Sequence, residues 1–390
     1  MKIERHSVFS FYPISDKEKR NLAMLELVGK KGSISRTEIS KITGINVVSV
    51  SNYINSYIEK NVISEKGLAV SSGGRKPELV ALNAADNHVV GVEIGKASIR
   101  VAILDLALKI ISKTSVPLEK LNMRETAAAI AGSVEEALKK AGVSKDVVKA
   151  VGIGIPDAAY VAVGASVEKG LDVPVFTGGR ASCAAFGERT LNKEAAAENL
   201  LYMHSDLGRG IIITGDTCLG AAGPGGEIET NVKPSVVKST APLHEWLKYL
   251  EPWGELFGII ASAKSEVSKG VGTKIVSAMK GDLSKITEEA IIEAANQDDE
   301  VALNIIESMG INLGLRIAYL VNLFSPEVVV IGGGPEKAGD ILFVPIKKMV
   351  KKLAFSQHVN DVKIVRGSLG EDAVSLGAAS LAIREIFLKA

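Results

Sequence analysis

The sequence contains little cysteine and few aromatic residues. Only Cys183 and Cys218 are cysteines among its 390 residues, and aromatic residues make up 5% of the chain. Two cysteines exclude a disulfide framework and a cysteine-rich zinc site. The N-terminal segment is polar, and no uninterrupted apolar run is long enough to cross a bilayer. We therefore expect a cytoplasmic protein without membrane association.

Net charge is also nearly absent, but the charges are unevenly distributed. Residues 1–83 contain 13 Lys and Arg against 8 Asp and Glu, a net of +5, which leaves 33 against 37, or −4, for the remainder. This asymmetry indicates that a polyanion would bind the front of the chain. The length and the 46% hydrophobic content predict two or three folded domains.

A helix-turn-helix pattern lies in the basic front part. Ser35 precedes Glu38 by three residues, the spacing of a capping box, so a helix is expected to begin at Arg36. Gly44 can end this helix with a positive φ, and Asn46 can cap a second helix from about residue 47 to 60. This arrangement is typical of DNA-reading heads, although caps and glycine turns also occur in other small helical domains.

The apolar spacing assigns a buried and an exposed face to each helix. Ile39 and Ile42 of the first helix are expected to share one inward face. The second helix is expected to bury Val47, Val50, Ile54, Tyr57 and Ile58. Small and amide side chains would then face the major groove. The predicted DNA contacts of the two helices are Arg36, Asn46, Val48, Ser49, Ser51, Asn52 and Asn55.

A wing is predicted after the second helix. Residues 62–70 and 78–82 alternate like a short hairpin, and the loop between them contains two glycines, Arg75, Lys76 and Pro77. The glycines would let the backbone approach a duplex, and the two cations could enter a minor groove or hold phosphates. The alternative for Arg75 and Lys76 is an ordinary solvated loop.

From residue 83 onward the pattern changes to α/β. A glycine run at 332–334 follows the last apolar strand directly, and such a loop can bring amides near a phosphate, although ordinary turns also need glycines. The expected strands are 88–94, 99–104, 108–116, 148–155 and 328–331, and the expected helices are 124–141 and 299–324.

Several segments together resemble the ROK family of repressors and sugar kinases. The segments that carry the resemblance are the head, the wing at 71–77, and the stretches 91–95, 220–228, 321–327 and 375–379. The resemblance covers nearly the whole chain. It implies a winged helix-turn-helix followed by a two-lobed, actin-like ATPase (ribonuclease H-like) fold. The implied domains are the head at 1–83, a first lobe at 84–198 completed by a C-terminal helix within 370–390, and a second lobe at 199–369.

The family contains both enzymes and transcription factors, so the site residues must distinguish them. Where the resemblance places the kinases' catalytic aspartate, this chain has Arg180, preceded by Gly178 and Gly179. Arginine stays protonated and has no lone pair, so it cannot act as a general base. Loss of such a base costs roughly 10²–10⁴ in rate.

Other matched positions depart from the kinase pattern as well. The interval before Gly178 is shorter than in the family, and Thr230 replaces a zinc-binding histidine, so we expect no metal and no cofactor. Glu227, with Gly179 and Arg180, would remain as contacts for a sugar effector, although Glu227 could equally be a structural carboxylate. The nucleotide loops that are expected to be degenerate contain Glu93, Gly95, His204, Ser205, Asp206, Gly332 and Gly333.

The favoured interpretation is a DNA-binding repressor of carbohydrate genes with a catalytically inactive body. It would bind a double-stranded operator with an inverted repeat as a homodimer or a dimer of dimers, and would respond to a small sugar. One alternative is a sugar kinase that kept its head, with Asp157 or Asp206 replacing the missing base. Another is an assembly scaffold without a small ligand. His204 and His244 are expected to be ordinary surface residues.

Overall fold

The computed structural model describes residues 7–8, 15–68, 77–95, 98–118, 121–156, 160–204, 208–213, 216–217, 259–278, 283–355 and 362–388. The chain forms two compact units. One contains Met1–Cys183 and Val374–Ala390, and the other contains Ala184–Ala373. The division falls inside helix α6 (Arg180–Leu191), before the predicted lobe boundary at residue 198. The head and the first lobe belong to the same unit.

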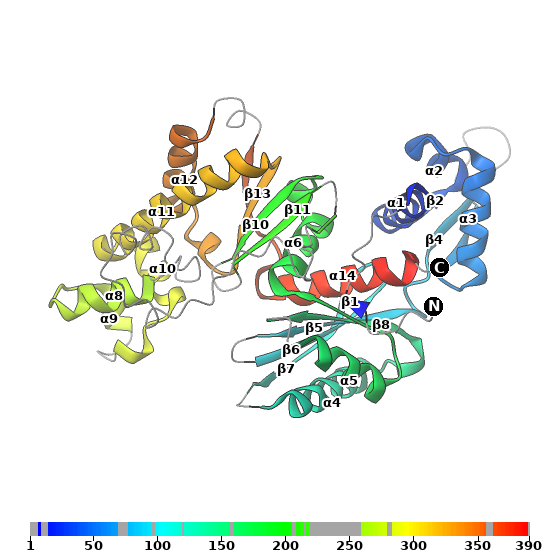
Figure 1. Cartoon of the computed structure of the whole chain (residues 1–390), viewed down its shortest axis with the longest axis horizontal. Coiled ribbons are helices and arrows are strands. Elements are labelled where there is room, and N and C mark those ends of the chain that lie inside the picture. The colour runs from blue at the N-terminus through cyan, green and yellow to red at the C-terminus, as the bar shows by residue number, and fades with distance from the viewer. Residues whose placement is uncertain are drawn as a thin grey trace, which may run out of the picture. The chain divides into compact units, whose positions relative to one another are not determined.

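The described part of the head contains helices and a small sheet (Figure 1). The helices are α1 (Asp16–Lys31), α2 (Arg36–Thr43) and α3 (Val47–Glu59), and the sheet order is β2 (Ile34–Ser35), β4 (Glu78–Leu82) and β3 (Ile63–Leu68). The Ser35 side chain accepts a hydrogen bond from the Glu38 amide, and that of Asn46 accepts one from the Ser49 amide. Gly44 ends α2 at a φ of 71°. The predicted helix-turn-helix and hairpin are confirmed.

Two predicted core residues of the head are exposed. Ile39 is fully buried, but Ile42 is 52% exposed, so the prediction of a shared inward face was wrong for Ile42. Val47 is 43% exposed, whereas Val50, Ile54 and Tyr57 of α3 are buried as predicted. Ile42 and Val47 flank the turn between the helices. Residues at the ends of α2 and α3 therefore stay more open to solvent than those in the middle of each helix.

The first unit also contains a six-stranded sheet. Its order is β1 (Ser7–Val8), β9 (Val175–Gly179), β8 (Val148–Ile155), β5 (His88–Ile94), β6 (Ser98–Asp105) and β7 (Ile110–Pro117). The first four strands are parallel, and β5, β6 and β7 form an antiparallel meander. Figure 1 shows α4 (Met123–Ala141) and α5 (Val161–Leu171) on one face and α14 (Ala373–Leu388) on the other. Every residue of β5 is buried, as expected for a strand covered on both faces.

Helix α14 packs very close to the sheet. A Cβ atom at Gly91 would lie 2.0 Å from the backbone oxygen of Ser375, and one at Gly152 would lie 2.0 Å from that of Ala378. Only glycine permits this approach. The C-terminal helix therefore belongs to the first unit, and the lobe boundaries that the resemblance implied stay a prediction.

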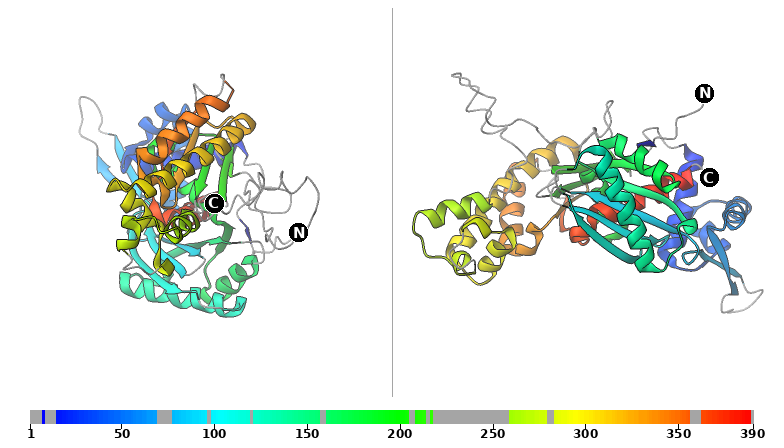
Figure 2. Two further views of the ribbon diagram at one scale, coloured as in Figure 1. Left: turned by 90° about the vertical axis from the view of Figure 1, so that its left-hand side faces the viewer. Right: turned by 90° about the horizontal axis from the view of Figure 1, so that it is seen from below.

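The second unit is built on a five-stranded sheet. Its order is β12 (Asp216–Thr217), β11 (Gly208–Ile213), β10 (Leu200–His204), β13 (Val328–Gly332) and β14 (Lys363–Arg366). Its core is made with α11 (Glu300–Phe324) and α12 (Asp340–Leu353), which run side by side in both views of Figure 2. The smaller helices of this unit are α8 (Ile259–Ser268), α9 (Lys274–Ala278) and α10 (Glu288–Asn296).

Helix α11 is long and apolar enough to cross a membrane by length and composition. It has 25 residues, and its most apolar window has a mean hydropathy of 1.2, but 50% of that window is buried inside the structure. A Cβ atom at Gly310 would lie 2.6 Å from the Cγ atom of Pro345, so α12 packs directly on it. These contacts are those of a core helix.

Candidate nucleic-acid interface and ligand site

The outer face of α3 presents polar side chains to solvent. Val48 is 71% exposed, Asn52 and Asn55 are exposed, and Ser49 and Ser51 are half-buried. The Ser51 hydroxyl donates to the Val47 carbonyl at 2.8 Å, so part of its hydrogen-bonding capacity is used inside the helix. Asn52 lies in the middle of the face, where its amide can reach a base edge.

Arg36 lies in a charged cluster behind this face. Its guanidinium donates to Glu78 at 3.0 Å, to Glu65 at 3.1 Å and to the side-chain oxygen of Asn55 at 3.1 Å. The cluster joins the start of α2 to both strands of the hairpin and to α3. Two carboxylates offset the charge of Arg36, so the structure assigns it a positioning role, and its predicted DNA contact stays a prediction.

A groove of about 800 Å³ lies between α1 and the turn that joins α2 to α3. Asn46 and Ser49 line it from α3, and Ile42 lines it from α2, which is where the exposed side of Ile42 faces. The sequence analysis missed the residues Arg20, Lys30 and Tyr53, which line the same groove. Ser15 and Glu18 form a complete capping box at the start of α1, so the rule that located α2 would also have located α1.

The structure describes both strands of the wing. Strands β3 and β4 pair antiparallel, with Ile63 opposite Leu82 and an irregularity in register between Glu65 and Leu68. The hairpin therefore forms as predicted. Arg75 and Lys76, the predicted contacts of its loop, lie outside the described residues.

Side-chain contacts join the head to the first lobe within the same unit. Tyr57 of α3 meets Phe387 of α14 edge to face, with ring centroids 6.1 Å apart. Burial raises the pKa of the Tyr57 hydroxyl to about 12. Beside it, the fully buried Asn87 donates to the backbone oxygens of Asn61 and Asn83. The end of α3 is thus anchored to the linker and to α14.

Arg180 begins α6 directly after β9 and is 7% exposed. A Cβ atom at Gly154 of β8 would lie 3.7 Å from the Arg180 Cγ atom, which places the arginine beside the carboxyl ends of the parallel strands. Gly179 is buried at the end of β9. Asp157, Ser205, Asp206, Glu227, Thr230 and His244 lie outside the described residues, so the grouping of the predicted effector contacts stays a prediction.

The first predicted nucleotide loop, which contains Glu93 and Gly95, makes its polar contacts with neighbouring residues of the same sheet. Glu93 is 5% exposed, and its carboxylate accepts from Arg100 on the neighbouring strand at 3.0 Å. The Gly95 amide donates to the Ser98 carbonyl at 2.9 Å. A strand-to-strand ion pair therefore holds the carboxylate that the resemblance places at this loop.

Two side chains, Glu336 beside the loop and His204 of β10, fill the space around the glycine loop after β13. The Gly334 amide donates to the Glu336 carboxylate at 2.7 Å, and a Cβ atom at Gly333 would lie 2.4 Å from the His204 ring. His204 is half-buried and its ring tilts against that of Tyr202, and the expectation that it is an ordinary residue without a catalytic role stays a prediction. Burial raises the pKa of Glu336, which lies at the place where a phosphate would approach this loop.

The family model described as the ROK family matches residues 89–229 and 270–385. The chain belongs to the ROK family. Among curated relatives of this ROK protein, the xylose repressor of Caldicellulosiruptor bescii is 25% identical and the match covers 95% of this chain and 96% of the relative. The DNA-binding transcriptional dual regulator NagC of Escherichia coli is 24% identical, with 94% and 93% covered.

An enzyme is also among the relatives. The glucokinase of Halalkalibacterium halodurans is 28% identical, and the match covers 95% of the glucokinase but 76% of this ROK protein. Among solved structures, a ROK family transcriptional regulator described as a homologue of the Escherichia coli MLC protein superposes with a TM-score of 0.73 at 22% identity, covering 96% of this chain and 97% of that one. A ROK glucokinase from Streptomyces griseus gives 0.63 at 23% identity, covering 76% and 99%. The fold is therefore that of a two-lobed ROK body with a head.

Proposed function

We propose that this ROK protein is a DNA-binding transcriptional regulator that represses carbohydrate genes in the cytoplasm. The observation that carries the proposal is the match to named repressors over nearly the whole chain, head included, while the glucokinase match leaves about a quarter of it without a counterpart. The exposed polar face of α3 supports the same role because it has the small and amide side chains that suit a major groove.

The kinase-like body would bind an effector without transferring phosphate. Arg180 supports this because a guanidinium cannot accept a proton. The glycine loop supports it independently, because the Glu336 carboxylate already accepts from the Gly334 amide and would repel a phosphate. A coupled assay of ADP release across hexoses, pentoses and N-acetylhexosamines tests this. Sugar-dependent turnover at rates usual for kinases would support the enzyme instead.

A dimer would let two heads read an inverted repeat. Helix α11 carries an apolar stripe that suits such a dimer: Ile311, Leu315, Tyr319 and Leu323 recur every four residues and are 40%, 51%, 62% and 60% exposed. Phe355, which follows α12, adds a side chain 61% exposed. Together these side chains form an exposed apolar patch, and such patches often mark interaction surfaces.

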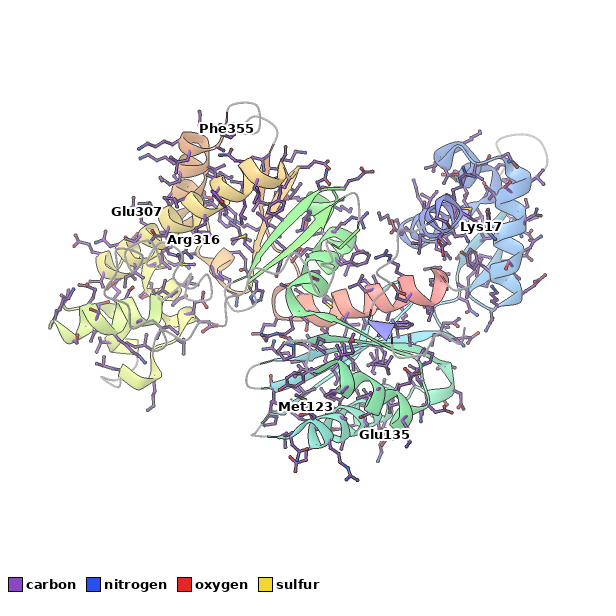
Figure 3. The ribbon with its side chains drawn as sticks, viewed as in Figure 1. Lys17, Met123, Glu135, Glu307, Arg316 and Phe355 are labelled. Atoms are coloured by element: carbon purple, nitrogen blue, oxygen red, sulfur yellow. The ribbon has the colours of Figure 1, made fainter. Side chains whose placement is uncertain are left out.

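The charges around the stripe favour a second copy of this chain as its occupant. Helices α11 and α12 run parallel, since Gly310 packs near Pro345 and Asn322 bonds to the amide of Phe355. Glu307 lies toward the start of α11 (Figure 3), and α12 ends in the exposed Lys351 and Lys352. A two-fold antiparallel pairing of α11 would therefore place the acidic end of one copy near the basic end of the other.

DNA selection with the purified full-length protein tests the proposed function directly. We expect enrichment of an inverted repeat whose half-sites are about 10 bp apart, or a multiple of this, because two-fold heads read equivalent faces of the helix. Random, unenriched sequences after repeated rounds would contradict the proposal. If DNA binding and ligand binding both fail while the chain assembles, the scaffold interpretation is supported.

A further inference from the structure

Arg180 is a buried cation whose charge is not offset within the described part of the chain. It is 7% exposed, and no hydrogen bond or ion pair joins its side chain to any described residue. Glu93, a carboxylate at this edge of the sheet, is held by Arg100 at 3.0 Å. Arginine cannot release its proton to relieve burial, so an unpaired guanidinium in this position is unfavourable without a negative partner.

The backbone adds positive charge at the same point. Arg180 is the first residue of α6, a helix of 12 residues, and the amides of a first helical turn lack partners inside the helix. The helix dipole makes this end positive, and a positive side chain there is repelled rather than stabilised. The guanidinium and the helix terminus therefore both favour an anion at this point.

The position of Arg180 is also one where α/β folds bind ligands. Strands β5, β8 and β9 are parallel, and Glu93, Gly154 and Gly178 lie in register across them near their carboxyl ends. Ligands of open α/β sheets bind outside these ends. Arg180 follows Gly178 by two residues, and its Cγ atom lies beside Gly154.

We propose that Arg180 binds the anionic group of an acidic sugar, so that the effector is a sugar acid or a sugar phosphate rather than a neutral sugar. The inference deepens the proposed function and rests on it for the sugar part of the ligand. A guanidinium fits both groups because its planar donors pair with two oxygens of a carboxylate or a phosphate.

The test measures binding to the full-length protein by titration calorimetry and thermal shift. The probes are matched sets at constant ionic strength: glucose, glucuronate and glucose 6-phosphate; xylose and xylonate; N-acetylglucosamine and its 6-phosphate. We expect an acidic member to bind at least about tenfold more tightly than its neutral counterpart, and the arms separate carboxylate from phosphate.

Three variants locate the effect. Arg180→Gln should abolish the preference for the acidic member, and Arg180→Lys should keep part of it. Arg124→Gln is the matched control, since Arg124 lies in the first turn of α4 but is exposed, and it should leave the preference unchanged. Without ligand, Arg180→Gln should melt no lower than the unchanged protein, because it removes an uncompensated buried charge.

Equal binding of neutral and acidic sugars, an acidic preference that survives Arg180→Gln, or no binding of any member would overturn the inference. These outcomes are separable from failure of the proposed function. Operator selection without acidic-sugar preference refutes the inference alone. Acidic-sugar binding without any DNA selectivity refutes the regulator.

Discussion

Gly91 and Gly152 show how a single methyl group can decide the packing of the first lobe. Both lie beneath α14, where a Cβ atom would approach a backbone oxygen to 2.0 Å. A backbone oxygen cannot rotate away as a side chain can, so a larger residue must displace the helix. Because α14 also contacts the head through Phe387, this packing affects more than the lobe itself.

Gly152→Ala is expected to lower the free energy of unfolding by about 3 kcal/mol or more, as overpacking against backbone does. Gly132→Ala is the matched control. Gly132 lies in the middle of α4, with nothing within 4 Å of its Cβ position, so alanine there should be neutral or add up to about 1 kcal/mol through helix propensity. Denaturant midpoints of both variants measure this, and equal midpoints would contradict the observed packing.

Glu336→Gln is expected to stabilise the protein at neutral pH. Burial raises the pKa of Glu336 above its ordinary 4.5, so the folded state holds the proton more tightly than the unfolded state. Its favourable contribution is complete below pH 4.5 and is lost as pH rises through the folded pKa. Glutamine keeps an acceptor for the Gly334 amide without the charge. The difference in melting temperature between the variant and the unchanged protein should therefore grow in favour of the variant as pH rises.

Melting temperatures between pH 4 and pH 8 check this, because that range begins near the ordinary pKa of a glutamate and extends well above it. Glu135→Gln is the control, because Glu135 lies exposed on α4 (Figure 3) and its neutralisation should give no such trend. A loss of stability by Glu336→Gln at neutral pH would show that the ionised carboxylate is needed to hold the glycine loop.

At the scale of elements, the sequence correctly predicted the features that depend on neighbouring residues, namely helix caps and buried strands. Ser35 and Asn46 cap their helices as their positions suggested, and the apolar run at 148–155 is the buried strand β8. The pairing of β1 with β9 was not predicted, because a strand of two residues has no periodicity to detect. The sheet edge that accepts it lies far along the chain.

The candidate site was less predictable than the fold. Arg36 was expected to face DNA, but its partners Glu65 and Glu78 are 29 and 42 residues away, and nothing in the local pattern indicates them. The identity of Arg180 predicts that the general base is missing. Its burial, and the filling of the glycine loop by Glu336 and His204, required the three-dimensional contacts.

Arg36→Met is expected to weaken operator binding without changing its salt dependence. The guanidinium is already paired with two carboxylates, so its loss should misplace α3 rather than remove a phosphate contact. Lys76→Ala provides the contrast, since loss of one phosphate contact reduces the slope of log K against log salt by about 0.9. Binding titrations at several salt concentrations compare the two. A reduced slope for Arg36→Met would assign Arg36 to the DNA backbone.

At the scale of the whole molecule, the proposed dimer would form through the exposed stripe of α11. The double variant Leu315→Asp with Tyr319→Asp should convert a dimer to monomers, because two carboxylates would face their copies across the two-fold axis. Ile111→Asp is the control, since Ile111 is an apolar residue 41% exposed on β7 in the other unit. Sedimentation velocity measures the outcome. A double variant that stays dimeric would place the interface elsewhere.

Helix α14 connects the proposed effector site to the reading helix within one unit. At its start, Val374 packs against Gly154, beside which Arg180 also lies. At its far end, Phe387 meets Tyr57 of α3. A helix of 16 residues is about 24 Å long and transmits displacement as a rigid body. We therefore expect that an anion bound to Arg180 displaces α14, and that α14 in turn displaces α3.

Phe387→Leu is expected to reduce the response to effector while leaving operator binding by the free protein within a few-fold. Couplings of this kind usually change affinity 5- to 150-fold, roughly 1–3 kcal/mol. Loss of the ring contact should therefore bring the operator affinities measured with and without effector much closer together. Tyr57→Phe is the control, because it keeps the ring contact at 6.1 Å and removes only a buried hydroxyl. Operator affinity is measured with and without the sugar that gives the largest thermal shift. An unchanged ratio in Phe387→Leu would show that the signal reaches the head by another route, such as the Asn61, Asn83 and Asn87 network beside it.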